Sequence, residues 1–166
     1  MKAGIGTAAI TLPDGLVVGA VVAVNAIGDI IDPGSGRPVA GVRTADGRGL
    51  ADVRRLLRAP VNPEARPGES TTIAVVATNA TLTKVQAAKV AQMAHDGLAR
   101  AIVPSHLTLD GDTVFAVATG TLAGLPRVDV VGALAADALA DAIVRAARTS
   151  RGLPGLPSAA TLASAP

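Results

Sequence analysis

The sequence predicts a mixed α/β (α+β) fold on three observations. A β-branched and almost wholly apolar run covers Thr71–Ala77, which indicates a strand in the centre of a sheet. Apolar residues recur at helical spacing over the following segment, Lys84–Arg100. A second strand, Thr113–Ala118, and a second helix, Val128–Arg148, follow in the same order. We therefore expect a β-α-β-α C-terminal half within a single domain of residues 1–150.

The N-terminal half begins with two more strands. Gly4–Leu12 and Leu16–Ile27 are apolar runs on either side of Pro13-Asp14-Gly15, whose residue types favour a turn. The two runs are expected to pair as a hairpin, with the second strand strongly buried.

The remaining segments carry weaker signals. Residues 29–49 are rich in Gly, Pro and Asp and are expected to be an irregular loop. Residues 50–58 favour one or two helical turns, and the Pro-rich segment 59–69 is expected to be a linker. The tail, residues 151–166, is rich in Gly, Pro, Ser and Ala and is expected to be disordered.

The first of the two long helices has a clear start. Thr83 can cap it, and Gln86 stands three residues later, which is the capping-box pattern. Along the second helix, Leu134, Ala138 and Ala142 recur every four residues and are expected to face the core.

Composition excludes several classes of function. Aromatic residues make up 1% of the chain, so binding of single-stranded nucleic acid by base stacking is excluded. The chain has no cysteine and only two histidines, so neither thiolate chemistry nor a histidine-built tetrahedral zinc site is expected. The net charge of +2 does not indicate an acidic partner such as nucleic acid.

The chain also lacks the signals of a membrane or secreted protein. No apolar run reaches the roughly 18 residues that a membrane-spanning helix needs. Leu16–Ala26 is similar to the core of a signal peptide, but Pro13-Asp14-Gly15 interrupts the segment before it. We therefore expect a cytoplasmic protein with no membrane partner.

Four features are candidates for chemistry. The first, Gly4-x-Gly6-x-x-Ala9, matches a dinucleotide-binding fingerprint as a bare pattern. That motif needs a strand before the glycines and a helix after them, whereas here the glycines lead into a strand. A glycine-rich strand start is therefore the favoured interpretation.

The second feature is the junction of Ser70 and Thr71, where a Pro-rich segment leads into the buried strand. Strand starts often carry Thr, so the hydroxyls have a structural explanation. The layout is also that of a self-cleaving N-terminal-nucleophile hydrolase, in which a hydroxyl attacks the peptide carbonyl before it and the resulting ester hydrolyses. The freed α-amine, with an ordinary pKa of about 8, then acts as the base for its own hydroxyl.

The third feature is the pair Asp110 and Asp112, which flank a glycine as in a turn. They can also orient a nucleophile's amine or hold a substrate's amino group. The fourth is Asn25, an amide within an apolar run, which is expected to be buried and hydrogen-bonded, either to backbone or as an oxyanion-hole donor. His95 and His106 are expected to be structural, with His106 near the Asp pair in sequence.

Longer motifs make a family resemblance visible. The C-terminal half contains TTIAVVATNA (71–80), LTKVQAAKVAQMAHDGLARAI (82–102) and DGDTVFAVATG (110–120). The N-terminal half contains KAGIGTAAI (2–10) and VGAVVAVNAIGDIIDP (18–33). Together these segments resemble the DmpA-like family, the L-aminopeptidase/D-esterase and β-aminopeptidase enzymes, over most of residues 2–147.

The resemblance implies an α-β-β-α sandwich and self-cleavage between an α-chain-like region, residues 1–70, and a β-chain-like region, residues 71–150. It places the freed nucleophile at Thr71, so that the bond cleaved joins Ser70 to Thr71. Asn25 matches the family's oxyanion-stabilising Asn, and Asp110 and Asp112 match the polar and acidic positions that support the nucleophile and its amine. The implied substrates are small peptides or N-terminal aminoacyl amides and esters, hydrolysed without a metal or an organic cofactor.

Two departures from the family pattern affect these expectations. Family members commonly carry Asn or Gly before the nucleophile, whereas this chain has Ser70. The chain begins where the family's sequence is already partly complete, so the sandwich is expected to be incomplete at the N-terminus. We therefore expect a homo-oligomer, or a partner chain that supplies the missing N-terminal region.

Two other interpretations remain open. An acyl transferase of the ornithine acetyltransferase type has a similar fold and a self-generated threonine nucleophile, but it passes the acyl group to an amino acid rather than to water. An inactive, truncated scaffold would keep the fold without the site.

Overall fold

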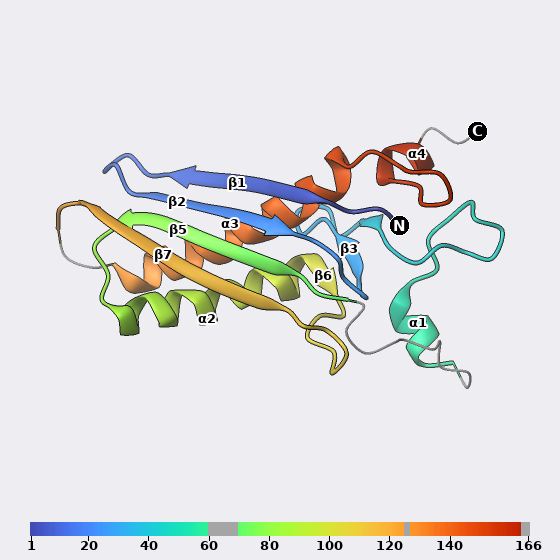
Figure 1. Ribbon diagram of the computed structural model, residues 1–166, viewed down its shortest axis with the longest axis horizontal. Coiled ribbons are helices and arrows are strands. Elements are labelled where there is room, and N and C mark those ends of the chain that lie inside the picture. The colour runs from blue at the N-terminus through green and yellow to red at the C-terminus, as the bar shows by residue number, and fades with distance from the viewer. Residues whose placement is uncertain (60–69, 125–126, 164–166) are drawn as a thin grey trace.

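Two helices cover one face of a four-stranded sheet in the computed structural model, which describes residues 1–59, 70–124 and 127–163 (Figure 1). The strands are β1 (Ile5–Thr11), β2 (Val17–Ala23), β5 (Ile73–Ala80) and β7 (Thr113–Leu122), in the order β1-β2-β5-β7. The pairs β1–β2 and β2–β5 are antiparallel, whereas β5 and β7 are parallel. The mixed α/β class and the N-terminal hairpin are confirmed.

Alternation along the strands separates the two faces of this sheet. In β2, Val18 and Val22 are buried, whereas Val17 and Val21 are exposed. Successive side chains of a strand point to opposite faces, so one face of the sheet belongs to the core and the other lies open. Position in the strand, rather than residue type, thus decides which valine is buried.

The covered face packs against α2 (Lys84–Ala101) and α3 (Val128–Thr149), which also pack against each other. The two helices approach closely at Gly97, where an added Cβ atom would lie 2.4 Å from the Ala136 carbonyl oxygen. Leu139 is completely buried in this layer. Among the described residues, none of the helices is both long enough and apolar enough to cross a membrane.

The start of α2 has the predicted capping box. The Thr83 hydroxyl accepts the Gln86 N–H, and the Gln86 side chain accepts the Thr83 N–H at 2.8 Å. Because two otherwise unpaired backbone donors are satisfied in this way, the helix begins at a defined residue.

A smaller sheet lies at the end of the large sheet from which β5 and β7 begin (Figure 1). Its strands are β4 (Pro38–Ala40), β3 (Asp29–Ile31) and β6 (Ile102–Val103), in the order β4-β3-β6. The irregular loop expected over residues 29–49 is therefore wrong in part, because β3 and β4 pair within it.

Buried Asp29 organises this segment. Its carboxylate accepts the N–H of Val42 at 3.1 Å and the N–H of Val53 at 2.8 Å. Val53 begins α1 (Val53–Leu57), the short helix that the sequence predicts over residues 50–58. One buried carboxylate with two backbone partners thus orders a stretch whose Gly, Pro and Asp content favours a loop.

The tail differs from the expected disorder. It contains α4 (Ala159–Ala163) and the buried Ser158. The Lys2 N–H donates to the Pro157 carbonyl oxygen at 2.9 Å, so the tail contacts the segment before β1. The Pro-rich linker expected over 59–69 lies, from residue 60 onward, outside the described residues.

The second face of the large sheet is turned toward the viewer in Figure 1, and no described helix or strand lies over it. The large apolar side chains exposed on this open face are Ile5, Val17, Val21, Ile73, Phe115 and Val117. Soluble proteins seldom expose apolar side chains in such a continuous group unless the group binds something. The described residues thus form the large sheet, its helical layer and the small sheet, and a second sheet over the open face, as in an α-β-β-α sandwich, is not among them.

Candidate active site

Thr71 and Asn25 lie opposite each other, two residues beyond the end of β2 and two residues before the start of β5. The antiparallel register pairs Ala23 with Ile73, and its continuation by two residues pairs Asn25 with Thr71. The Thr71 N–H donates to the Asn25 carbonyl oxygen at 2.8 Å, in agreement with that register. Directly opposed side chains have Cβ atoms about 5 Å apart. The Thr71 hydroxyl and the Asn25 amide therefore share the open face.

The peptide bond before Thr71 is held from the other side by the segment that leads into β7. Ser70 pairs in parallel with Asp110, and the Gly111 N–H donates to the Ser70 carbonyl oxygen at 3.1 Å. The Thr71 hydroxyl donates to the same oxygen at 2.7 Å. The hydroxyl thus lies beside the carbonyl group that a self-cleaving chain would attack.

Asp112 supports this arrangement from the covered side of the sheet, where its side chain is 3% exposed. Its Oδ1 accepts the Thr72 N–H at 2.9 Å, in the place that the Gly111 carbonyl oxygen would take in a regular parallel ladder. Its Oδ2 lies 3.8 Å from the Nδ1 of His106. Asp112 therefore fixes the backbone one residue after Thr71.

Asp110 ends the turn before β7 rather than forming part of a turn with the next two residues. The Asp110 N–H donates to the Leu107 carbonyl oxygen at 2.9 Å, and the Asp110 carboxylate accepts the Leu107 N–H at 3.2 Å. Burial, followed by the negative charge of Asp112, raises the pKa of the Asp110 carboxyl. The N–H groups of Leu107 and Ile27 and the His106 ring act in the opposite direction.

Asn25 is exposed, which corrects the expectation of a buried amide. The alternation of β2 continues beyond Ala23, so Val24 is buried and Asn25 faces the open side. Asn25, Thr71 and Ile73 line one open pocket of about 680 Å³. A substrate carbonyl in this pocket can therefore reach the hydroxyl and the amide together.

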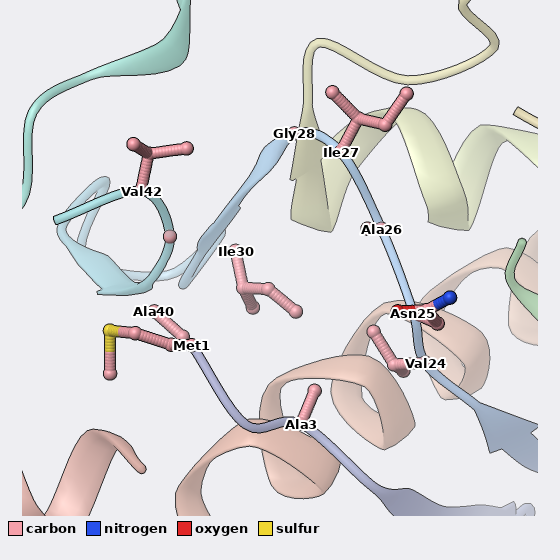
Figure 2. A pocket seen from close by; sticks show the side chains of 11 residues that line it. Met1, Ala3, Val24, Asn25, Ala26, Ile27, Gly28, Ile30, Ala40 and Val42 are labelled. Carbon is pink, nitrogen blue, oxygen red and sulfur yellow. The ribbon is translucent and has the colours of Figure 1, made fainter. Parts of the chain in front are cut away.

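A smaller cavity of about 100 Å³ adjoins Asn25 on the side of the small sheet (Figure 2). Val24, Ile30 and Ala40 point toward it, whereas the Asn25 amide nitrogen is drawn on the side away from Ile30 and Met1. None of the described residues that line it has an acidic, basic or nucleophilic side chain. The larger pocket is therefore the better candidate for an active site.

The two histidines lie together near Asp112. The ring centroids of His95 and His106 are 5.0 Å apart. Burial, followed by the charge of His106, lowers the pKa of His95, and Asp112 acts in the opposite direction. Within the part of the chain that the structure describes, no three His, Asp or Glu side chains are grouped as metal ligands.

Gly6 of the dinucleotide-like pattern has a packing role instead. Gly6 lies in β1 on the covered face, where a Cβ atom would lie 2.0 Å from the Ala142 carbonyl oxygen of α3. The segment leads into a strand and not from a strand into a helix, as a dinucleotide site requires.

Comparison with known proteins identifies the family. Residues 1–159 match the sequence model of peptidase family S58. The chain belongs to this family. An uncharacterized aminopeptidase of Mycobacterium leprae is 39% identical over 182 aligned residues, which cover 95% of this chain and 48% of that protein. The resemblance drawn from the motifs is confirmed, and the chain spans about half the length of the curated relatives it matches.

Two solved aminopeptidase structures are similar to this chain in fold. A β-aminopeptidase of Burkholderia sp. superposes with a TM-score of 0.51 at 27% identity, covering 88% of this chain and 42% of that one. The L-aminopeptidase D-Ala-esterase/amidase of Ochrobactrum anthropi, described as a variant of the Ntn hydrolase fold, superposes with a TM-score of 0.54 at 21% identity. The superposition covers 89% of this chain and 40% of the Ochrobactrum protein.

Gly111 also lies against Ser70 and Thr71, which the sequence pattern does not reveal. Its contribution is a backbone N–H, and an added Cβ atom would lie 2.7 Å from the Thr71 Oγ1. The only sequence signal is a glycine between two carboxylates, which is equally typical of a turn.

The raised pKa of Asp110 predicts a pH-dependent effect on stability. An ionised carboxylate with a raised pKa is less favourable in the folded chain than in the unfolded chain, so it destabilises the fold increasingly as pH rises through the folded-state pKa. Asp110→Asn keeps an oxygen acceptor for the Leu107 N–H and is expected to raise the melting temperature at pH 8. The gain should shrink toward zero near pH 4, close to the ordinary carboxyl pKa of about 3.9.

Thermal unfolding followed by circular dichroism at both pH values measures this gain. Asp141→Asn, at an exposed position of α3, is the matched control and should show no comparable pH-dependent gain. A melting temperature of Asp110→Asn that falls at pH 8 but not at pH 4 would contradict the assignment.

Proposed function

We propose that this chain is the nucleophile-bearing part of a self-processing aminopeptidase. Cleavage of the bond between Ser70 and Thr71 makes Thr71 a new N-terminus, which then hydrolyses N-terminal aminoacyl amide or ester bonds of small substrates. The observation that carries the proposal is the Thr71 hydroxyl, which donates to the Ser70 carbonyl oxygen at 2.7 Å. Membership of peptidase family S58 and the aminopeptidase name of the M. leprae relative support this class of reaction.

Self-cleavage begins when the Thr71 Oγ attacks the Ser70 carbonyl carbon. The C–N bond breaks, the hydroxyl proton ends on the leaving nitrogen, and an ester joins the Ser70 carbonyl to the Thr71 oxygen. Water then hydrolyses the ester. The products are a Ser70 carboxylate and a Thr71 residue with a free hydroxyl and a free α-amine.

Substrate turnover uses the amine that this step creates. The Asn25 carbonyl oxygen lies 2.8 Å from the Thr71 nitrogen in the uncut chain and is placed to keep holding it as an amine. The amine accepts the hydroxyl proton as the Thr71 Oγ attacks the substrate carbonyl. The Asn25 side chain, on the same open face, donates to the oxyanion. The bond to the substrate's amine or alcohol then breaks, this group leaves with the proton from the Thr71 amine, and water hydrolyses the acyl ester on the Thr71 oxygen.

We also propose an occupant for the open face of the large sheet: an apolar sheet from a polypeptide equivalent to the half of its relatives that this chain does not match. Ile73 and Phe115 are 49% and 56% exposed on this face. Burying side chains of this size stabilises an assembly by about 1.5–3 kcal/mol each. Sheets pack about 10 Å apart, so such a layer would also cover the pocket beside Thr71.

The first test is self-cleavage itself. Intact-mass measurement of the purified chain is expected to give residues 1–70 and 71–166 as separate pieces. Thr71→Ala should remain uncut because it lacks the attacking oxygen, whereas Thr71→Ser should be cut. Ser70→Ala is the matched control, since it removes the neighbouring hydroxyl but keeps the carbonyl that is attacked. A wild-type chain that stays whole would leave the proposed function without its nucleophile.

Asn25→Ala tests the oxyanion donor of turnover. Removing one such donor is expected to lower kcat for an aminoacyl p-nitroanilide by about 10²–10³-fold, with a much smaller change in KM. Asn25→Asp keeps the shape of the side chain but offers no N–H, so it should lose at least as much. The rates are measured per cleaved molecule, so that incomplete processing does not imitate the effect. A kcat of Asn25→Ala close to wild type would contradict the assignment.

Phe115→Asp tests the open face. Co-purification with a tagged polypeptide that carries the unmatched half of the M. leprae relative is expected to give a one-to-one complex, and Phe115→Asp should weaken it at least tenfold, about 1.4 kcal/mol. Val85→Asp is the control, because Val85 is 79% exposed but lies at the start of α2, away from the open face. A homodimer that uses the same face would assign it to a second copy of this chain and overturn the proposed occupant.

A further inference from the structure

We propose that the Gly111 N–H is the oxyanion donor of self-cleavage, and that turnover of substrate uses a different donor, the Asn25 side chain. The inference rests on the proposed self-cleavage at Thr71 and assigns to it a group that neither the motifs nor the family match single out. Its starting point is the hydrogen bond of 3.1 Å from the Gly111 N–H to the Ser70 carbonyl oxygen.

The planarity of the peptide bond separates the two donors in space. In a trans peptide, the N–H and the carbonyl oxygen point in opposite directions. The Thr71 N–H points toward β2, where it donates to the Asn25 carbonyl oxygen at 2.8 Å. The Ser70 carbonyl oxygen must therefore point toward the segment that leads into β7, where Gly111 meets it. The charge that develops on this oxygen during attack arises on the side of Gly111.

The geometry suits a preorganised donor. Oxyanion donors work at about 2.7–3.1 Å from the oxygen that becomes charged. The Gly111 N–H cannot turn away, because Ser70 pairs with Asp110 on one side and the Thr113 N–H donates to the Thr72 carbonyl oxygen at 3.0 Å on the other. As the Ser70 carbonyl carbon becomes tetrahedral, the existing hydrogen bond becomes charge-assisted and therefore stronger.

The same contact explains why position 111 is a glycine. Its φ lies outside the left-handed range, so its backbone conformation does not require glycine. An added Cβ atom would instead lie 2.7 Å from the Thr71 Oγ1 and 3.4 Å from the Thr71 Cγ2. Glycine therefore lets the donor approach the scissile carbonyl while the attacking hydroxyl keeps its place.

Self-cleavage needs only the atoms of the chain, followed by water for hydrolysis of the ester. The bond from the Thr71 Oγ to the Ser70 carbonyl carbon forms, and the π pair of the carbonyl moves onto its oxygen, which the Gly111 N–H stabilises. The pair then returns, the bond to the Thr71 nitrogen breaks, and that nitrogen leaves with the hydroxyl proton. Asn25 takes no part through its side chain until a substrate carbonyl replaces the Ser70 carbonyl in the pocket.

An amide-to-ester replacement tests the donor alone. The full chain is assembled by chemical ligation with glycolic acid in place of Gly111, which removes the N–H and adds no atom near Thr71. The matched control carries the α-hydroxy analogue of threonine at position 113, which removes the neighbouring ladder donor to the Thr72 carbonyl oxygen. Formation of the 1–70 piece after refolding is followed by intact mass, and thermal unfolding of both esters is compared.

The replacement at position 111 is expected to slow self-cleavage by about 10²–10³-fold, with the control at position 113 close to the unmodified chain. Asn25→Ala should slow self-cleavage less than the Gly111 ester does. Equal rates for both esters, whether fast or slow, would show that the bond is only part of the ladder and overturn the inference, while cleavage by the unmodified chain would still support the proposed function. An unmodified chain that never cleaves would overturn both.

Discussion

The peptide bond between Ser70 and Thr71 is held on both sides by neighbouring segments of the sheet. Its N–H donates to Asn25, two residues after β2, and its carbonyl oxygen accepts from Gly111, two residues before β7. Cleavage sites of ordinary proteases lie in exposed loops, where the backbone can be reshaped by the enzyme. In the proposed self-cleavage the attacking hydroxyl belongs to Thr71 itself, so the bond would need no access for a second protein. The strand order β1-β2-β5-β7 is what places a partner on each side.

The residues of the candidate site lie on both faces of the sheet. Thr71 and Asn25 lie on the open face, while Thr72, the residue after Thr71, and Asp112, before β7, lie on the covered face. The proposed reacting groups therefore face the pocket, and the carboxylate that fixes the backbone lies on the side covered by the helices. Because a shift of one residue exchanges the faces of a strand, this division depends on the register between β2 and β5.

Much of the fold follows from local sequence signals. Periodicity located β5 and α2, and the Thr83 and Gln86 pair predicted the start of α2 correctly, because these signals act within one turn or one strand. The strands within residues 29–49 were missed because their order comes from Asp29, whose partners lie 13 and 24 residues away. Composition describes a segment's preferences, but it does not reveal such distant bonds.

For the candidate site, too, local signals were readable from the sequence and distant contacts were not. The hydroxyl at Thr71 was visible from its place before an apolar strand, but the exposure of Asn25 was not, since an apolar run hides which face each residue takes. The sequence gives no sign of Gly111 because its proposed role uses the backbone N–H, which every residue except proline has. What singles it out is the parallel pairing of Ser70 with Asp110, which no local pattern encodes.

Division of the chain at residue 70 would leave two polypeptides that share one sheet. β1 and β2 would belong to the first and β5 and β7 to the second, while α3 packs across β1 and β2 and β6 pairs with β3 (Figure 1). The pieces would stay interlocked as long as the sheet is intact. Once unfolded, however, they would have to find each other again, so refolding would become a second-order process that slows with dilution. The mature protein would then owe its persistence to slow unfolding rather than to an equilibrium it can readily re-enter.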